Sequence, residues 1–211
     1  MIALSDLFTF MAVVFGLFLV PGPAVLLVIT RTAQGGRRTG ILTGLGIATG
    51  DLVHTLAAAV GLSAVLATSA LAFTLVKVAG AGYLFYLGVR AILAKPSTPA
   101  TATSLPATPL APARAFLQAI PAELLNPKTA LFFLAFMPQF VRADHASPFA
   151  QFLVLGLVFV AMSAAYTSLL VLAIGPIGRL ARRISWLARW QGKIVGSIFI
   201  ALGLKVALQK Q

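Results

Sequence analysis

The sequence contains no cysteine and few charged residues. Only 9% of its 211 residues are charged, whereas soluble domains average about a quarter. The missing cysteines exclude disulfides and thiolate metal sites. With two histidines and no cysteine, the chain also lacks the clustered ligands that a transition-metal site needs. We therefore expect neither a metal nor another cofactor.

Common enzyme motifs are missing as well. The chain has no Gly-x-x-x-x-Gly-Lys-Ser/Thr loop for nucleotide phosphates, no His-Glu-x-x-His motif and no Gly-x-Ser-x-Gly nucleophile elbow. These absences disfavour direct use of ATP and the chemistry of a membrane hydrolase. We predict that the protein is not an enzyme.

Long apolar runs are what the sequence does contain. Apolar residues make up 60% of the chain, and its long runs exceed the roughly 20 residues that cross a bilayer. Six such runs cover approximately 4–29, 40–66, 71–93, 115–141, 149–174 and 190–208. The first has no positively charged leader, so we expect a retained span and not a signal peptide. The predicted fold class is all-α: a polytopic membrane protein with six transmembrane helices.

The basic residues lie between these runs. The net charge is +12, but the arginines and lysines form no one-faced patch of the kind that binds nucleic acid. The positive connections follow runs one, three and five, which places them in the cytoplasm and both termini outside. These residues are Arg31, Arg37, Arg38, Arg90, Lys95, Arg114, Arg179, Arg182, Arg183 and Arg189.

The two halves of the chain share three short matches in the same order. The corresponding pairs are Pro23 with Pro127, Gly44 and 51–55 with Gly156 and 163–167, and 77–81 with 193–197. Three spans per half give the halves opposite orientations in the membrane, as in transporters with inverted repeats. We predict a first repeat in 1–94, a cytoplasmic linker in 95–114 and a second repeat in 115–211. Chance similarity between apolar helices is the alternative.

Prolines interrupt the first and fourth spans at equivalent repeat positions. The breaks are Pro21-Gly22-Pro23 and Asn126-Pro127. A proline inside a helix leaves the carbonyl four residues earlier without its donor, so Pro21 frees Leu17 and Pro127 frees Glu123. Broken backbone inside a membrane is tolerated only against protein or a water-lined cavity. The freed carbonyls therefore need partners.

Each break also starts a new half-helix. Pro23 and Pro127 stand at first helical positions, and Asn126 is a suitable cap. The positive end of a helix dipole favours an anion. We predict that Pro21, Gly22, Pro23, Asn126, Pro127 and Lys128 line a site for a substrate carboxylate. A simple proline kink is the alternative.

Ionisable side chains inside spans are costly and by default mark function. Asp51 lies near the middle of the second span, and His54 follows on the same helical face. Asp51 needs a cation, and Lys128 is the deepest one available; Lys77 is a second candidate for an ion pair. We predict that Asp51 holds a substrate ammonium, or carries a coupling proton with His54. A structural ion pair is the alternative, and Glu123 is left without a role.

Together these motifs resemble the lysine exporter (LysE/RhtB) family of bacterial amino-acid efflux proteins. The match rests on Pro21-Gly22-Pro23, on 44–54, on 77–84 and on Asn126-Pro127-Lys128 with the phenylalanines and prolines that follow, and it covers nearly the whole chain. The resemblance implies export of amino acids or small derivatives across a bacterial inner membrane in exchange for protons. It does not select a substrate among those of the family, which include basic amino acids, homoserine, threonine and leucine.

The expected partners are thus a small-molecule amino acid, protons and the lipid bilayer. Export of another small solute or cation is the alternative function, and a membrane enzyme is a more distant one. The oligomeric state stays open, because the glycine-rich helix faces could pack within one monomer or between copies in a homo-oligomer.

Overall fold

The computed structural model describes residues 2–19, 22–68, 110–142 and 147–181, with single residues between 75 and 93 and at 193, 197 and 200. Every regular element in these residues is helical, which confirms the all-helical class. The expected third and sixth spans, 71–93 and 190–208, fall largely outside the described residues. So do Pro21, Lys77 and most of the 95–114 linker.

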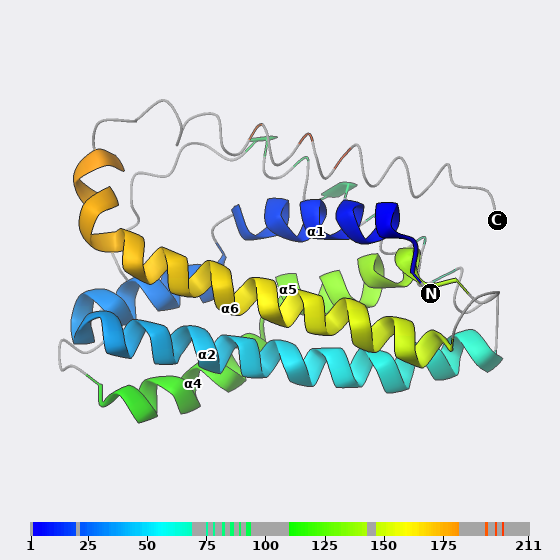
Figure 1. The fold of residues 1–211 in the computed structure, drawn as a ribbon, viewed down its shortest axis with the longest axis horizontal. Helices are drawn as coiled ribbons and strands as arrows, with labels where there is room; N and C mark the ends of the chain where they lie inside the picture. Colours follow the sequence, from blue (N-terminus) through cyan, green and yellow to red (C-terminus); the bar gives the residue numbers. More distant parts are fainter. Residues whose placement is uncertain are drawn as a thin grey trace.

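Long helices form the bundle in the described part of the chain (Figure 1). They are α1 (Leu4–Leu19), α2 (Pro23–Thr68), α4 (Pro112–Leu124) and α6 (Pro148–Ala181). Between α4 and α6 lie the short helix α5 (Pro127–Leu131), the π-helical turn η1 (Phe132–Phe136) and the 3-10 turn η2 (Met137–Phe140). Helices α4 and α6 both pack on α2, and α1 contacts α6.

Two described segments are long and apolar enough, by length and composition, to cross a bilayer. They are Pro23–Val65, whose 43 residues include a reversal at Gly36, and Pro148–Ala173, with 26 residues; α1 is a shorter apolar helix. Large hydrophobic side chains such as Phe8, Val60 and Leu169 are exposed on the outside of the bundle. Exposed apolar surface of this kind suits contact with lipid.

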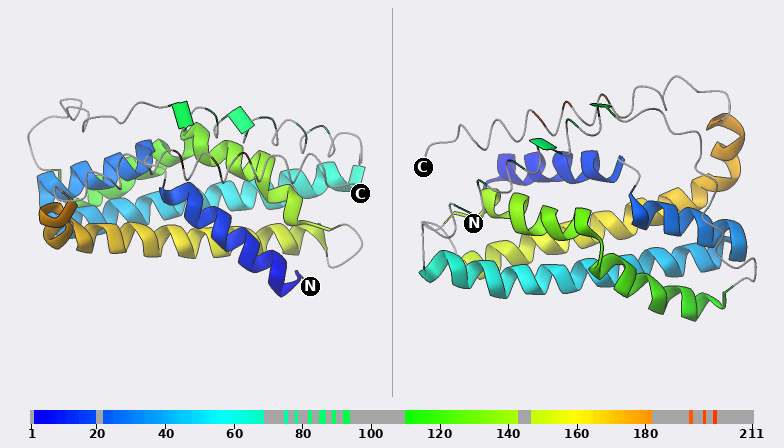
Figure 2. Two further views of the ribbon diagram at one scale, coloured as in Figure 1. Left: turned by 90° about the horizontal axis from the view of Figure 1, so that it is seen from above. Right: turned by 180° about the vertical axis from the view of Figure 1, so that it is seen from behind.

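Helix α2 consists of two arms that fold back on each other at Gly36. This residue has φ 75° and ψ −176°, a conformation open essentially only to glycine. The reversal brings Gly40 so close to Thr32 that a Cβ on Gly40 would collide with the Thr32 hydroxyl. Figure 2 shows the first arm leaving the end of α1 and the second arm returning beside α6. The sequence predicted a connection over 30–39; instead, both arms stay helical up to this turn.

Helices α2 and α6 approach each other closely through glycine and threonine. A Cβ added to Gly44 would lie 2.6 Å from Thr167 Oγ1, and one added to Gly156 would collide with Thr55. The Thr55 hydroxyl donates to Asp51 O at 2.9 Å, and that of Thr167 to Ser163 O at 2.8 Å. Because each hydroxyl bonds within its own helix, close packing and not hydrogen bonding defines these contacts.

Aromatic side chains fill the space between α1, α6 and the turns after α5. Phe10, Phe136 and Phe159 are buried there. The ring of Phe10 meets Phe140 edge to face at a centroid distance of 5.3 Å, and Phe132 lies 5.1 Å from Phe159. This core fixes η1 and η2 against α1, and with them the end of the interrupted helix that begins at α5.

We expect Gly36→Ala to destabilise the protein by about 1–3 kcal/mol, because alanine is strained in this backbone conformation. Crowding plays no part, since no atom lies within 4 Å of a Cβ placed on Gly36. Thermal unfolding in detergent measures the change. Gly61→Ala is the matched control: Gly61 is equally uncrowded, but it lies in regular helix, where alanine is favoured. Equal unfolding midpoints for the two variants would contradict the role of Gly36.

Candidate functional site

Both helix breaks predicted from the prolines are present. Helix α1 ends at Leu19 and α2 begins at Pro23, while α4 ends at Leu124 and α5 begins at Pro127. Asn126 caps α5 as expected, because its side-chain oxygen accepts a hydrogen bond of 3.1 Å from the backbone N–H of Lys128. The discontinuity of the first and fourth spans is therefore confirmed for the described residues.

Both carbonyls that the prolines free have hydrogen-bonding groups beside them. Lys128 Nζ donates to Leu17 O at 2.7 Å. Glu123 O accepts from the backbone N–H of Asn126 at 3.0 Å, and His54 Nε2 lies 3.2 Å from it. The first of these bonds joins the two breaks, since Lys128 belongs to the second and Leu17 to the first. Gly22 continues this contact: a Cβ on Gly22 would lie 3.3 Å from Lys128 Cδ.

The close fit at Gly22 explains why glycine stands between the prolines of the first break. A larger side chain there would press on the Lys128 stem, which has to pass this point to reach Leu17. Gly22 and Lys128, which the sequence assigned to one substrate site, thus lie next to each other; their part in binding a substrate stays a prediction. Pro21 lies outside the described residues.

The start of α5 has fewer free backbone N–H groups for binding an anion than the sequence predicted. It has five residues, and its first backbone donor, the N–H of Lys128, is already bonded to Asn126. The Ala130 N–H bonds to Asn126 O at 3.0 Å. The ammonium group of Lys128 and the start of α2 are therefore the better candidates for a substrate carboxylate.

Asp51 is buried between α2, α4 and α6. Its side chain is 1% exposed, and neither carboxylate oxygen has a hydrogen-bond partner among the described residues. The side chains of Glu123 and Ser163 lie within electrostatic reach of it. The ammonium of Lys128 is directed to Leu17 O at the first break, and the described residues show no ion pair between Lys128 and Asp51. Lys77 lies outside the described residues.

Glu123 is the functional candidate that the sequence reasoning missed. It is 2% exposed at the end of α4, whereas the sequence assigned it no role. The amide of Asn126 donates to both of its carboxylate oxygens, at 3.1 and 3.2 Å. A signal was available: Glu123 precedes Asn126 by three residues, the spacing at which side chains on a helical turn meet.

His54 faces Glu123 as well, through the backbone carbonyl. Its ring stacks on Phe133 with centroids 5.6 Å apart, so the imidazole is held between α2 and the π-helical turn. His54 thus belongs to the same cluster as Asp51, but the structure places it on the α4 side of the site. Across the described residues, no group of three or more His, Asp or Glu side chains could hold a metal ion.

Comparison with known proteins identifies the family. The sequence profile of the LysE type translocators matches residues 5–210. The chain belongs to this family. The family match agrees with the resemblance seen in the sequence and makes the protein a membrane transport protein.

Relatives cover nearly the full length of the chain. An uncharacterised membrane protein of Pseudomonas aeruginosa is 35% identical over 209 residues, which is 98% of this chain and 96% of the relative. A leucine efflux protein of Klebsiella pneumoniae is 27% identical over 194 residues, or 90% and 89% of the two chains. No solved structure matches the chain.

We expect Asn126→Asp to destabilise the protein by about 2 kcal/mol or more. Aspartate caps a helix as well as asparagine does, but here it replaces the amide that donates to Glu123 with a second buried carboxylate. Combining it with Glu123→Gln restores a donor and should recover most of the loss. Thermal unfolding in detergent measures all three variants. An Asn126→Asp midpoint equal to that of the wild type would show that the contact between Asn126 and Glu123 contributes nothing.

Proposed function

We propose that the protein exports amino acids or small derivatives from the cytoplasm by exchange with protons. Membership of the translocator family supports the transport class, and the leucine efflux proteins among the relatives support amino acids as substrates. The membrane would be a bacterial inner membrane. Leucine is the first substrate to test.

The observation that carries this proposal is the hydrogen bond between Lys128 and Leu17, which brings the two helix breaks together. The buried polar residues of the second break extend from it to Asp51; they are Glu123, Asn126 and Thr129. A buried polar cluster among apolar helices is expensive, so it indicates function. Transporters commonly bind substrate where interrupted helices meet near the middle of the membrane.

The substrate would be bound at its two charged ends. We assign its carboxylate to the ammonium group of Lys128 and to the start of α2 at Gly22 and Pro23. Asp51, at the other side of the cluster, would hold the ammonium group or carry the coupling proton, with His54 nearby. Asn126 and Pro127 shape the second break and keep Lys128 in place.

Two reciprocal contacts support an inverted repeat within six spans. Gly44 packs on Thr167, and Gly156 packs on Thr55. If Gly44 corresponds to Gly156 and Thr55 to Thr167, exchanging the halves turns one contact into the other. Ser163, which corresponds to Asp51, also lies beside it. Such exchange is expected for helices related by a two-fold axis in the membrane plane.

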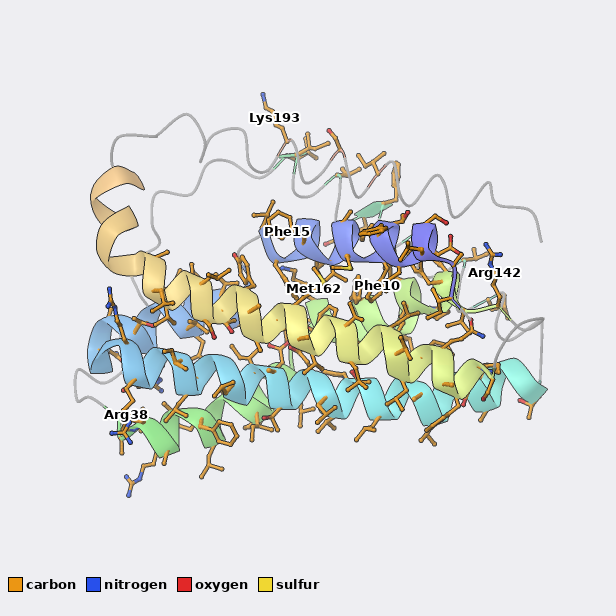
Figure 3. The ribbon with its side chains drawn as sticks, viewed as in Figure 1. Phe10, Phe15, Arg38, Arg142, Met162 and Lys193 are labelled. Atoms are coloured by element: carbon orange, nitrogen blue, oxygen red, sulfur yellow. The ribbon has the colours of Figure 1, made fainter. Side chains whose placement is uncertain are left out.

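The proposed orientation places the Arg38 end of the bundle in the cytoplasm. Arg37 and Arg38 are exposed at the turn of α2, and Figure 3 shows Arg38 and Arg142 at opposite ends of the bundle. Arg142 is paired with Asp6 at 3.1 Å, so its positive charge is offset at the end assigned to the outside. The bias of uncompensated arginine toward the cytoplasmic side agrees with the positive-inside rule.

We expect Asp51→Asn to abolish proton-driven export while the protein still inserts and folds. Asparagine keeps the shape of the side chain but can neither bind a proton nor attract an ammonium group as an anion does. Proteoliposomes loaded with a panel of labelled amino acids, beginning with leucine, measure export with and without a proton gradient. Asp6→Asn is the control, because it removes a partly exposed carboxylate far from the helix breaks and should export normally.

Two results would contradict the proposal. Failure of the wild-type protein to transport any member of the panel would contradict amino-acid export itself. Normal gradient-dependent export by Asp51→Asn would leave export standing but remove Asp51 from the mechanism. Migration as a single species in detergent confirms that each variant compared is folded.

A further inference from the structure

Two buried carboxylates, Asp51 and Glu123, face each other from different helices. We infer that they form one site that binds either a proton or the ammonium group of the substrate, but not both. This inference rests on the proposed amino-acid transport. It adds Glu123 to the mechanism. It also means that Asp51 both binds the substrate ammonium and carries the coupling proton, at different stages of the transport cycle.

The geometry of the pair is the first argument. Asp51 comes from the long arm of α2 and Glu123 from the end of α4, and the two side chains are close enough to interact electrostatically. Gly50 makes this approach feasible, since a Cβ there would lie 2.7 Å from Glu123 Cβ. Both carboxylates are almost completely buried. An ionised carboxylate only accepts hydrogen bonds, so two of them in contact need a proton or another cation between them.

The partners of the two carboxylates differ, and this difference assigns the proton. Glu123 receives the amide of Asn126 on both oxygens, and Lys128 lies within electrostatic reach of it. Neither oxygen of Asp51 has a partner in the described part of the chain. A hydrogen bond to the charged form favours that form. Glu123 is therefore the anion, and Asp51 is the group that carries the proton and donates it toward Glu123.

The polar groups around the pair are directed so that a cation can bind on the Asp51 side. From α2, His54 approaches the backbone carbonyl of Glu123; from α5, Lys128 reaches Leu17. Helix α6 contributes Ser163, whose side chain lies beside Asp51. A primary ammonium has three N–H donors, which match the two carboxylates and the Ser163 hydroxyl oxygen. The proton and the ammonium group would therefore compete for the same acceptors.

This competition gives an exchange that balances in protons and charge. When the site faces the cytoplasm, the ammonium group binds, the Asp51 O–H bond breaks, and the proton leaves to the cytoplasmic water. When the site faces outside, a proton from the outer water returns to Asp51 and the ammonium group departs. One positive charge then occupies the pair in each state, and no state leaves both carboxylates buried without a cation, which would be costly.

Binding measurements on the purified protein test the inference. Leucine is titrated by calorimetry into the protein in lipid nanodiscs, in buffers with different heats of ionisation, and over a range of pH. We expect release of about one proton per leucine, and an apparent Kd that rises about tenfold for each unit of falling pH while Asp51 holds the proton. Asp51→Asn should release no proton and bind with a pH-independent Kd. Asp6→Asn should behave as the wild type.

A ligand without the amino group distinguishes the contribution of the substrate's carboxylate from that of its ammonium group. The 2-hydroxy analogue of leucine keeps the carboxylate and the side chain, so it should bind without releasing a proton. Glu123→Gln should weaken leucine binding by about tenfold or more, because one charged acceptor of the ammonium is lost. It should leave binding of the hydroxy analogue unchanged, which also shows that the variant is folded.

The outcomes distinguish this inference from the proposed function. Leucine binding to the wild type without proton release, or equal proton release by the hydroxy analogue, overturns the competition and leaves amino-acid transport standing. Equal leucine affinity in Glu123→Gln and the wild type removes Glu123 from the site. No binding of leucine or of any other amino acid in the panel contradicts the proposed function itself. The wild-type measurements alone decide whether the proton and the ammonium group compete, even if a variant does not fold.

Discussion

A backbone carbonyl inside a membrane has to find a donor, and this requirement organises the centre of the structure. Pro21 and Pro127 lack the backbone N–H groups that would donate to the carbonyls of Leu17 and Glu123 in a continuous helix. The hydrocarbon region of the membrane contains no water that could replace these donors. Lys128 Nζ donates to Leu17 O, while Glu123 O accepts from the backbone N–H of Asn126 and also contacts His54 Nε2. Lys128 and His54 each come from a different part of the chain than the carbonyl they contact. The breaks are thus also the points at which separate helices are joined.

The same requirement explains why polar residues gather at this place. Lys128 is directed to Leu17, and the Asn126 amide is directed to Glu123. Asp51 is left buried without a hydrogen-bond partner among the described residues. An isolated buried acid is costly to maintain. In a translocator that cost is consistent with a group whose partner arrives and leaves during the transport cycle.

The sequence predicted the features that depend on local rules. Proline chemistry identified both breaks, the freed carbonyls and the cap at Asn126, because each follows from residues within four positions of one another. What it missed depends on contacts between distant segments. The meeting of Asp51 with Glu123 requires α4 to pack on α2 through Gly50, and the direction of Lys128 requires α1 to lie beside α5. The connection at 30–39 was expected, but not that both arms would stay helical up to Gly36, because arginine and threonine suit a helix end, a loop or a helix equally well.

The threonines between α2 and α6 have one more consequence. Thr55 and Thr167 satisfy their hydroxyls within their own helices, and each packs tightly against the glycine opposite, Thr55 with its methyl group nearest Gly156 and Thr167 with its hydroxyl oxygen nearest Gly44. Displacing one helix along the other would break no hydrogen bond at these two positions. A shift of either helix along the other would, however, move each threonine off its glycine and against a neighbouring residue that carries a Cβ. These two contacts therefore fix the relative position of α2 and α6 along their axes by steric fit alone.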